Sequence, residues 1–138
     1  MDKIVVTEKL KSLNRCLERI KVNAPSTIAD LKNDIDKQDI INLNLQRAIQ
    51  ISVDIASHIL AEDFNEQSKT MSNVFLKLSE KNILEKALAE KLVKSVGFGN
   101  VAVHEYTTID IKILYAIITK NLDCFYEFAR VILKSLNQ

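Results

Sequence analysis

The sequence predicts an all-α fold, a bundle of four to six helices, from three observations. Its 138 residues include one proline and two glycines, whereas sheet proteins use both residue types heavily in turns. Apolar residues recur at spacings of three and four along most of the chain, which is the period of an α-helix. Hydrophobic residues make up 47% and charged residues 27%, an ordinary globular composition. The length is that of one domain, so we expect a single helical domain over residues 1–138.

The first three helices can be placed from their apolar faces and caps. The first is predicted over residues 3–22. A short second helix follows, with Ser26 as its expected N-cap, and it ends before Asp36. The third begins at Asp36 or Asp39 and runs to about Ala61. One face of the first helix carries apolar residues at spacings of three, four and three: Leu10, Leu13, Leu17 and Ile20.

The third helix is apolar on nearly all sides. Between Ile40 and Leu60 its only charged residues are Arg47 and Asp54, with His58 beside them. A helix of this composition must be buried on more than one side. We therefore expect it to be the central helix or one that also forms a subunit interface.

The second half of the chain is expected to hold three more helices. Residues 62–70 are polar and predict a surface loop, which a short helix over about 71–80 follows. Asn82 is the expected cap of a helix over about 83–96. The last helix is predicted over about 110–136. Its apolar residues keep the helical period: Leu114, Ile117, Ile118, Phe125, Phe128, Ile132 and Leu136.

Charge and cysteine content argue against several classes of function. The net charge of +1 does not by itself predict binding to nucleic acid or to a membrane surface. Cys16 and Cys124 have neither zinc-site nor disulfide-framework spacing, so we interpret them as reduced, partly buried thiols of a cytoplasmic protein. We expect no signal peptide, because charged residues interrupt the start, and no membrane span. Neither a metal nor a cofactor is expected, because the histidines and cysteines lack ligand spacing.

Residues able to do chemistry concentrate between positions 96 and 110. This segment holds both glycines, one of the two histidines, His104, and one of the three tyrosines, Tyr106. The glycines are expected to loosen the backbone between two helices. On one helix, residues two positions apart point about 200° apart, so His104 and Tyr106 would converge only in a turn, at a helix end or across a dimer axis. An imidazole here can act as general acid or base, although a plain core or surface histidine is the alternative.

The same segment resembles the signature of HepT-like proteins of the HEPN superfamily. That signature is Gly-Phe-Arg-Asn, three residues, His, any residue, Tyr, and then Ile-Asp or Val-Asp. The resemblance covers essentially the whole chain and includes residues 45–50, 53–56, 58–60, 75–78 and 82–84. The residues of the signature in this chain are Gly97, Phe98, Gly99, Asn100, His104, Tyr106, Ile109 and Asp110.

The resemblance implies a homodimeric HEPN-type bundle with a metal-independent endoribonuclease site at the dimer interface. His104 would take a proton from a ribose 2′-hydroxyl or give one to the leaving oxygen, and the product would be a 2′,3′-cyclic phosphate. Asn100 would orient the motif or a phosphate oxygen. Tyr106 would lie at the same cleft, with its neighbour Glu105 in a supporting role. RNA, rather than DNA or a membrane, would be the target.

The resemblance also implies a partner. The chain would be the toxin of a type II/VII-like toxin–antitoxin pair. Its antitoxin would be a minimal nucleotidyltransferase that transfers AMP to Tyr106. Such a modification adds bulk and negative charge where RNA must bind, which explains inactivation physically.

Gly99 departs from the family signature, which places Arg there with four residues between it and the His. An arginine would hold the scissile phosphate and offset charge in the transition state, which glycine cannot do. Loss of such a contact commonly costs about 3–4 kcal/mol, or two to three powers of ten in rate. Three explanations stay open: a naturally weak member of the family, an engineered form of a toxic protein, or another cation, such as Arg47, in the same role.

A polar stripe on the third helix is a second group of interest. Arg47, Asp54 and His58 are seven and four residues apart and fall within about 40° of one another around the helix. The stripe is either partly exposed or a structural ion network, or it faces the motif or the dimer cleft and positions His104 or RNA. The lysines over residues 77–94 could guide RNA or an acidic antitoxin, but intervening glutamates favour a solvated face.

Two other classes of function compete with the nuclease. The chain could be a non-catalytic HEPN subunit that binds nucleotide or a nucleotidyltransferase partner, with Gly99 marking the lost activity. It could also be a plain helical assembly protein. An RNA cleavage assay with and without an arginine at position 99 distinguishes a disabled nuclease from a binding subunit.

Overall fold

The computed structural model describes the backbone of residues 1–104 and 108–137, and the side chains of residues 1–100 and 109–137. This part of the chain is mainly helical, which confirms the predicted all-α fold. Helix α6, the π-helical turn η1 and helix α7 follow one another without a break. Counted as one helix, they bring the number of helices in the described part of the chain to six, within the predicted range of four to six. The elements are α1 (Lys3–Asn23), α2 (Ile28–Lys32), α3 (Ile35–Phe64), α4 (Asn73–Glu80), α5 (Lys86–Ala102), β1 (Val103–His104), β2 (Thr108–Ile109), α6 (Ile111–Ala116), the π-helical turn η1 (Ile117–Asn121) and α7 (Leu122–Leu136).

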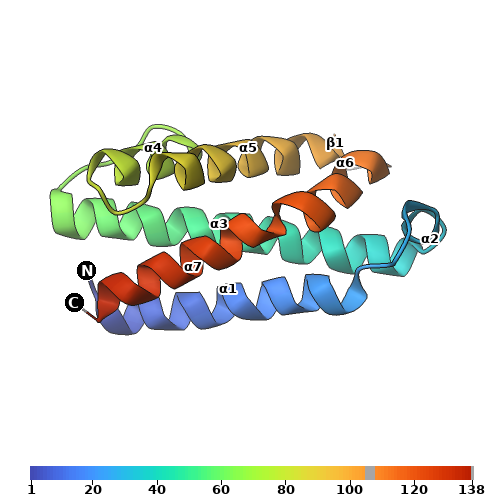
Figure 1. Ribbon diagram of the computed structural model, residues 1–138, viewed down its shortest axis with the longest axis horizontal. Helices are drawn as coiled ribbons and strands as arrows, with labels where there is room; N and C mark the ends of the chain where they lie inside the picture. Colours follow the sequence, from blue (N-terminus) through green and yellow to red (C-terminus); the bar gives the residue numbers. More distant parts are fainter. Residues whose placement is uncertain (105–107, 138) are drawn as a thin grey trace.

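Helix α3 is the central element of the bundle. Figure 1 shows it running along the molecule with α1 on one side, α4 and α5 on the other, and α7 crossing in front. It packs against α1, α2, α4, α5 and α7. This arrangement confirms that a helix without a polar face is buried on several sides.

The core is one cluster of buried apolar side chains to which every α-helix contributes. Leu10, Leu13, Leu17 and Ile20 are all buried, which confirms the predicted apolar face of α1. The seven periodic residues of the last predicted helix are buried as well. Across the core, the rings of Phe75 in α4 and Phe128 in α7 meet edge to face, with centroids 5.6 Å apart.

Two predicted helix starts were wrong, because neighbouring side chains form the caps. Thr27, rather than Ser26, caps α2, and its hydroxyl accepts a hydrogen bond from the Asp30 N–H. Asp34, rather than Asp36 or Asp39, caps α3, and its carboxylate accepts from the Lys37 N–H. Which residue caps a helix depends on whether its side chain reaches a free backbone N–H of the first turn. Several adjacent polar residues here have side chains of a type that can do so, and the sequence does not distinguish them.

Asn82 was predicted to cap the helix after α4 but instead closes α4 itself. It adopts a left-handed conformation with φ of 60°, and the Ile83 N–H donates to the Leu78 carbonyl at 2.9 Å. Asparagine tolerates this conformation at helix C-termini better than most residues. Helix α5 then begins at Lys86 rather than near residue 83.

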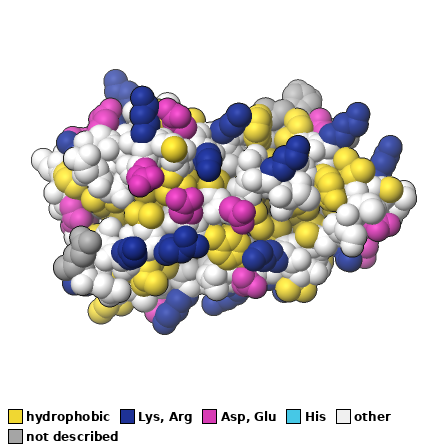
Figure 2. Space-filling view, in the orientation of Figure 1, with side chains coloured by type: hydrophobic (Ala, Val, Ile, Leu, Met, Phe, Trp, Pro, Cys, Tyr) yellow, Lys and Arg dark blue, Asp and Glu magenta, His cyan; other side chains and the backbone are white. Residues whose placement is uncertain are grey.

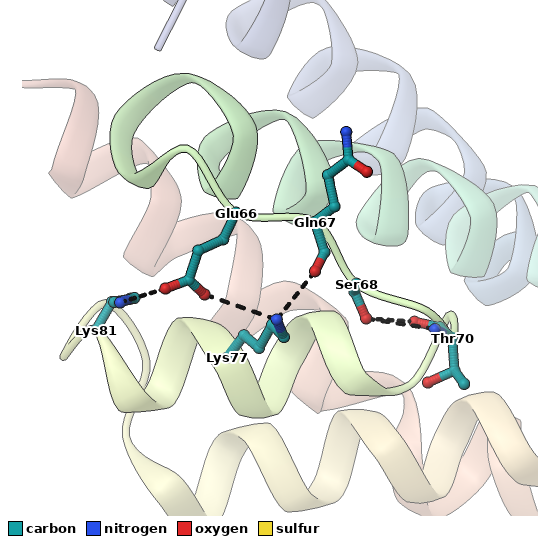
Figure 3. A network of polar contacts seen from close by, with 6 residues as sticks. All are labelled: Glu66, Gln67, Ser68, Thr70, Lys77 and Lys81. Carbon is teal, nitrogen blue, oxygen red and sulfur yellow. Dashed lines mark hydrogen bonds and ion pairs between the residues drawn. The ribbon is translucent and has the colours of Figure 1, made fainter.

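The loop after α3 lies later in the sequence than predicted, because α3 continues to Phe64 and α4 begins at Asn73. Figure 3 shows how an ionic cluster ties this loop to α4. The Glu66 carboxylate forms ion pairs with the Lys81 ammonium at 2.6 Å and with the Lys77 ammonium at 3.7 Å. The Lys77 ammonium also donates a hydrogen bond to the Gln67 carbonyl. The hydrogen bond from Lys81 lowers the pKa of Glu66 more than partial desolvation raises it, and the charges of Lys81 and Lys77 lower it further.

The predicted last helix contains a π-helical turn, η1, between α6 and α7. The Thr119 hydroxyl donates to the Tyr115 carbonyl within this segment at 2.7 Å. Just after the turn, the Cys124 thiol donates to the Asn121 carbonyl and lies 3.3 Å from the Ser95 hydroxyl of α5. Burial raises the pKa of this thiol. Both cysteines are free, and they are buried rather than partly buried as predicted.

We predict that Phe128→Ala lowers the free energy of unfolding by about 3–5 kcal/mol, because it removes a fully buried ring and leaves a cavity beside Phe75. Denaturant titration followed by circular dichroism measures this loss. Leu133→Ala, at a half-exposed position of the same helix, is the matched control and should change stability much less. Equal losses in the two variants would contradict the described packing of α7.

Candidate functional site

The candidate site begins in the last turns of α5, which continues through both glycines to Ala102. Neither glycine has a positive φ. The expectation that they loosen the backbone between two helices was therefore wrong. Their environments differ: Gly97 has open space where a Cβ would point, whereas Gly99 is buried against α3.

Gly99 permits a close approach between α5 and α3. A Cβ built on Gly99 would overlap Ile49 Cδ1, so the end of the Ile49 side chain would have to shift. Ile49 is 1% exposed, so little free space surrounds it. The Gln46 side chain donates from Nε2 to the Gly99 carbonyl at 3.0 Å. The space beside Gly99 is thus occupied by Ile49 of the same subunit, and the position also lacks the cation of the family signature.

His104 lies just beyond the end of α5. Its backbone belongs to β1 and pairs antiparallel with β2, so that His104 faces Thr108 and Val103 faces Ile109 in the register. Because α5 ends at Ala102, one continuous helix does not carry positions 100–106. The predicted roles of the His104 side chain and of Glu105 and Tyr106 lie outside the described residues.

The other residues of the signature have places in the structure. Asn100 is exposed at the end of α5, next to Gly99. Ile109 packs against the core. Asp110 caps α6, and its carboxylate accepts from the Ile113 N–H at 3.1 Å. The Ile-Asp pair therefore anchors the chain after β2, which gives a structural reason for its place in the signature.

The stripe on α3 lies along the α1 side of the helix. The His58 Nε2 accepts from the Asp2 N–H at 3.1 Å, and the Met1 amino group pairs with Asp63. Arg47 is exposed and close enough to α1 for its charge to lower the pKa of Cys16, which burial raises more strongly.

Within one chain the stripe residues are bonded separately. Asp54 accepts from Gln50 at 2.8 Å, and among the described residues no ion pair joins it to Arg47. His58 lies twelve positions beyond Gln46 in α3, about 18 Å along the helix axis. Among the described side chains, Gln46 and Ile49 contact the motif at Gly99, and whether the stripe residues reach His104 or Tyr106 lies outside the described residues.

Gln46 and Ile49 were not identified as site residues from the sequence. Both lie in the apolar central helix, and no local pattern connects them to a glycine fifty or more residues away. Two signals were available: the segment 45–50 belongs to the family resemblance, and a glycine in a helix suggests a close backbone approach.

The described surface has mixed charge. Figure 2 shows lysine and arginine side chains spread over one face with aspartate and glutamate between them. Among the described side chains, those of residues 1–100 and 109–137, we find no group of three potential metal ligands. In the same described part, none of the helices combines the length and apolar character that crossing a bilayer requires.

Comparison with known proteins identifies the family. A model described as "HepT-like: Ribonuclease HepT-like" matches residues 13–132. The chain belongs to the HepT-like ribonuclease family. An mRNA nuclease HepT from Shewanella oneidensis is 30% identical over 128 residues, which cover 93% of this chain and 96% of the relative. A tRNA nuclease HepT from Aphanizomenon flos-aquae is 29% identical over 110 residues, covering 80% and 75%.

Solved structures agree with this family. The tri-AMPylated Shewanella oneidensis HEPN toxin, in complex with an MNT antitoxin, is 29% identical with a TM-score of 0.84, and the match covers 97% of this chain and 98% of that one. A toxin–antitoxin complex with AMP-PNP matches at 28% identity with a TM-score of 0.84, over 94% and 98%. The HEPN fold inferred from the motif is thereby confirmed.

We predict opposite effects of alanine at the two glycines of this HepT-like chain. Gly97→Ala should stabilise the protein by up to about 1 kcal/mol, because alanine favours the helix and the space is open. Gly99→Ala should destabilise it, because its Cβ meets Ile49. Thermal and denaturant unfolding of both variants measure the difference.

A double-mutant cycle checks the cause. Ile49→Val removes the methyl group that a Cβ at position 99 would meet, so Gly99→Ala should cost less in that background than in the natural chain. Additive effects, or stabilisation by Gly99→Ala alone, would show that position 99 is not closely packed.

Proposed function

We propose that this chain is the toxin-type subunit of a toxin–antitoxin pair and acts on RNA in the cytoplasm as a metal-independent endoribonuclease of the HEPN type. The observation that carries the proposal is the match to the AMPylated HEPN toxin over 97% of the chain. Two relatives named as mRNA and tRNA nucleases support RNA as the class of substrate. The chain retains His104, Tyr106 and Asn100 of the signature.

The proposed reaction needs an acid–base residue rather than a metal. His104 removes the proton of a ribose 2′-hydroxyl, and the resulting oxygen attacks the adjacent phosphorus. The bond from phosphorus to the 5′-oxygen breaks, and that oxygen takes up a proton. The products are a 2′,3′-cyclic phosphate and a free 5′-hydroxyl. Asn100, exposed at the end of α5, orients a phosphate oxygen or the motif.

The proposed active form is a homodimer whose interface holds the site. Apolar side chains exposed close to the motif support a subunit contact there. Phe98, next to Gly99, is 38% exposed, and Leu43, one turn before Gln46, is 49% exposed. In that arrangement Arg47, Asp54 and His58 would have a supporting role at the cleft, by positioning His104 or RNA.

The proposed antitoxin is a minimal nucleotidyltransferase that transfers AMP to Tyr106. The tyrosine oxygen attacks the α-phosphorus of ATP, pyrophosphate leaves, and the phenolic proton is released. Each AMP adds a negative charge and a bulky group two residues from His104, with Glu105 between them, so the RNA backbone is repelled and excluded. The relative that is both tri-AMPylated and bound to an MNT antitoxin supports this step.

We propose that Gly99 weakens cleavage in this chain. Without the family's guanidinium, the charge that develops on the phosphate loses a contact worth about 3–4 kcal/mol. The tight fit of Gly99 on Ile49 supports a natural chain whose packing has adapted to glycine. The same fit favours the second candidate function, a non-catalytic HEPN subunit that binds a nucleotidyltransferase.

An RNA cleavage assay with a fluorescent single-stranded substrate tests the proposal. The natural chain should cleave slowly, and Gly99→Arg combined with Ile49→Ala, which makes room for the new side chain, should cleave about a hundred to a thousand times faster. Adding His104→Ala should abolish both activities.

Three control variants make the result specific. Gly97→Arg adds the same charge at an open neighbouring position and should not raise the rate. Ile49→Ala alone measures the effect of the cavity. A loss of the natural chain's activity in Arg47→Ala would identify Arg47 as the substitute cation. If no variant cleaves RNA, the nuclease proposal fails and the binding subunit is favoured.

A further inference from the structure

The contact between Gln46 and the end of α5 is the observation that extends the proposed function. The Gln46 side chain is half-buried, and its Nε2 donates to the Gly99 carbonyl at 3.0 Å. Gly99 belongs to the last turn of α5, where carbonyls commonly accept bonds from outside the helix. This bond joins two segments that are far apart in the sequence.

The polar contact acts together with an apolar one. Ile49 lies one turn from Gln46 on the same face of α3 and packs where a Cβ of residue 99 would be. The apolar contact sets how closely α5 approaches α3. The hydrogen bond, which requires a defined direction, sets how α5 is rotated about its own axis. Two contacts of different kind therefore fix the end of this helix.

Further contacts hold the chain on the far side of His104. His104 lies five residues beyond Gly99, in a strand that pairs with β2. Ile109, the last residue of β2, packs on the core, and Asp110 caps α6. The segment that holds His104 thus extends from the Gln46–Gly99 contact at one end to the Asp110 cap at the other.

We propose that Gln46 is a positioning residue for His104. Its amide holds the last turn of α5, and through it the backbone that leads to the imidazole, in one orientation on α3. Acid–base catalysis depends on such preorganisation, because small displacements of the proton-transfer group cost rate. The effect of Gln46 on catalysis rests on the proposed function. Its effect on the orientation of α5 does not, because that is a property of the folded chain.

Two variants separate the hydrogen bond from the packing. Gln46→Met keeps the length of the side chain but has no donor, and Gln46→Glu replaces the donor with a carboxylate that repels the Gly99 carbonyl. Gln50→Met is the matched control, because Gln50 lies one turn further along α3 and bonds to Asp54 instead. The protein has two histidines, so His58 serves as an internal reference for the signals of His104.

Nuclear magnetic resonance and amide hydrogen exchange provide readouts that need no catalysis. Gln46→Met should shift the imidazole signals of His104 and speed exchange in the last turn of α5 by about 3- to 10-fold, with larger effects in Gln46→Glu. His58, the amides of α1 and the midpoint of unfolding should change little, and Gln50→Met should leave the signals of His104 in place. If RNA is cleaved, Gln46→Met should lower kcat more than it changes KM.

Either of two results would overturn the proposal. One is unchanged signals of His104 and unchanged exchange in Gln46→Met and Gln46→Glu. The other is an equal change throughout the protein, which would indicate a purely structural role. A chain that cleaves no RNA but shows the local effects would contradict the nuclease and leave the positioning role intact.

Discussion

The motif depends on the approach of α5 to α3 at Gly99. A buried isoleucine and a glutamine amide from the central helix meet one residue of α5 from which a side chain is absent. Beyond this contact the chain enters β1, pairs with β2 and is anchored again by Ile109 and Asp110. The fold thus brings the motif to the end of the bundle away from both termini, as Figure 1 shows.

The close approach of α5 to α3 also affects how the glycine at position 99, where the family has arginine, is interpreted. Viewed in the sequence, glycine at position 99 is only the loss of a cation. In the structure it is also a residue whose replacement displaces a side chain that is 1% exposed. Restoring a charged side chain at this position therefore also requires the end of the Ile49 side chain to move, so packing and catalysis are coupled here.

Helical periodicity made most of the fold predictable. The apolar face of α1 and the run of buried residues from Leu114 to Leu136 follow directly from spacing, and the composition of α3 predicts its central place. Helix starts at Thr27 and Asp34 were less predictable, because several adjacent polar residues can cap. The resemblance identified the motif, but the Gln46–Gly99 bond joins residues with no shared local pattern, and only the tertiary structure reveals it.

Transfer of AMP to the chain is the decisive test of its proposed role as the toxin subunit. The purified chain is incubated with ATP and the MNT antitoxin of the Shewanella oneidensis toxin, and intact mass and peptide mapping are recorded. The account predicts one or more AMP groups on Tyr106, none on Tyr106→Phe, and loss of RNA binding or cleavage by the modified protein. An unmodified chain, in the presence of an enzyme that modifies the Shewanella oneidensis toxin, would contradict it.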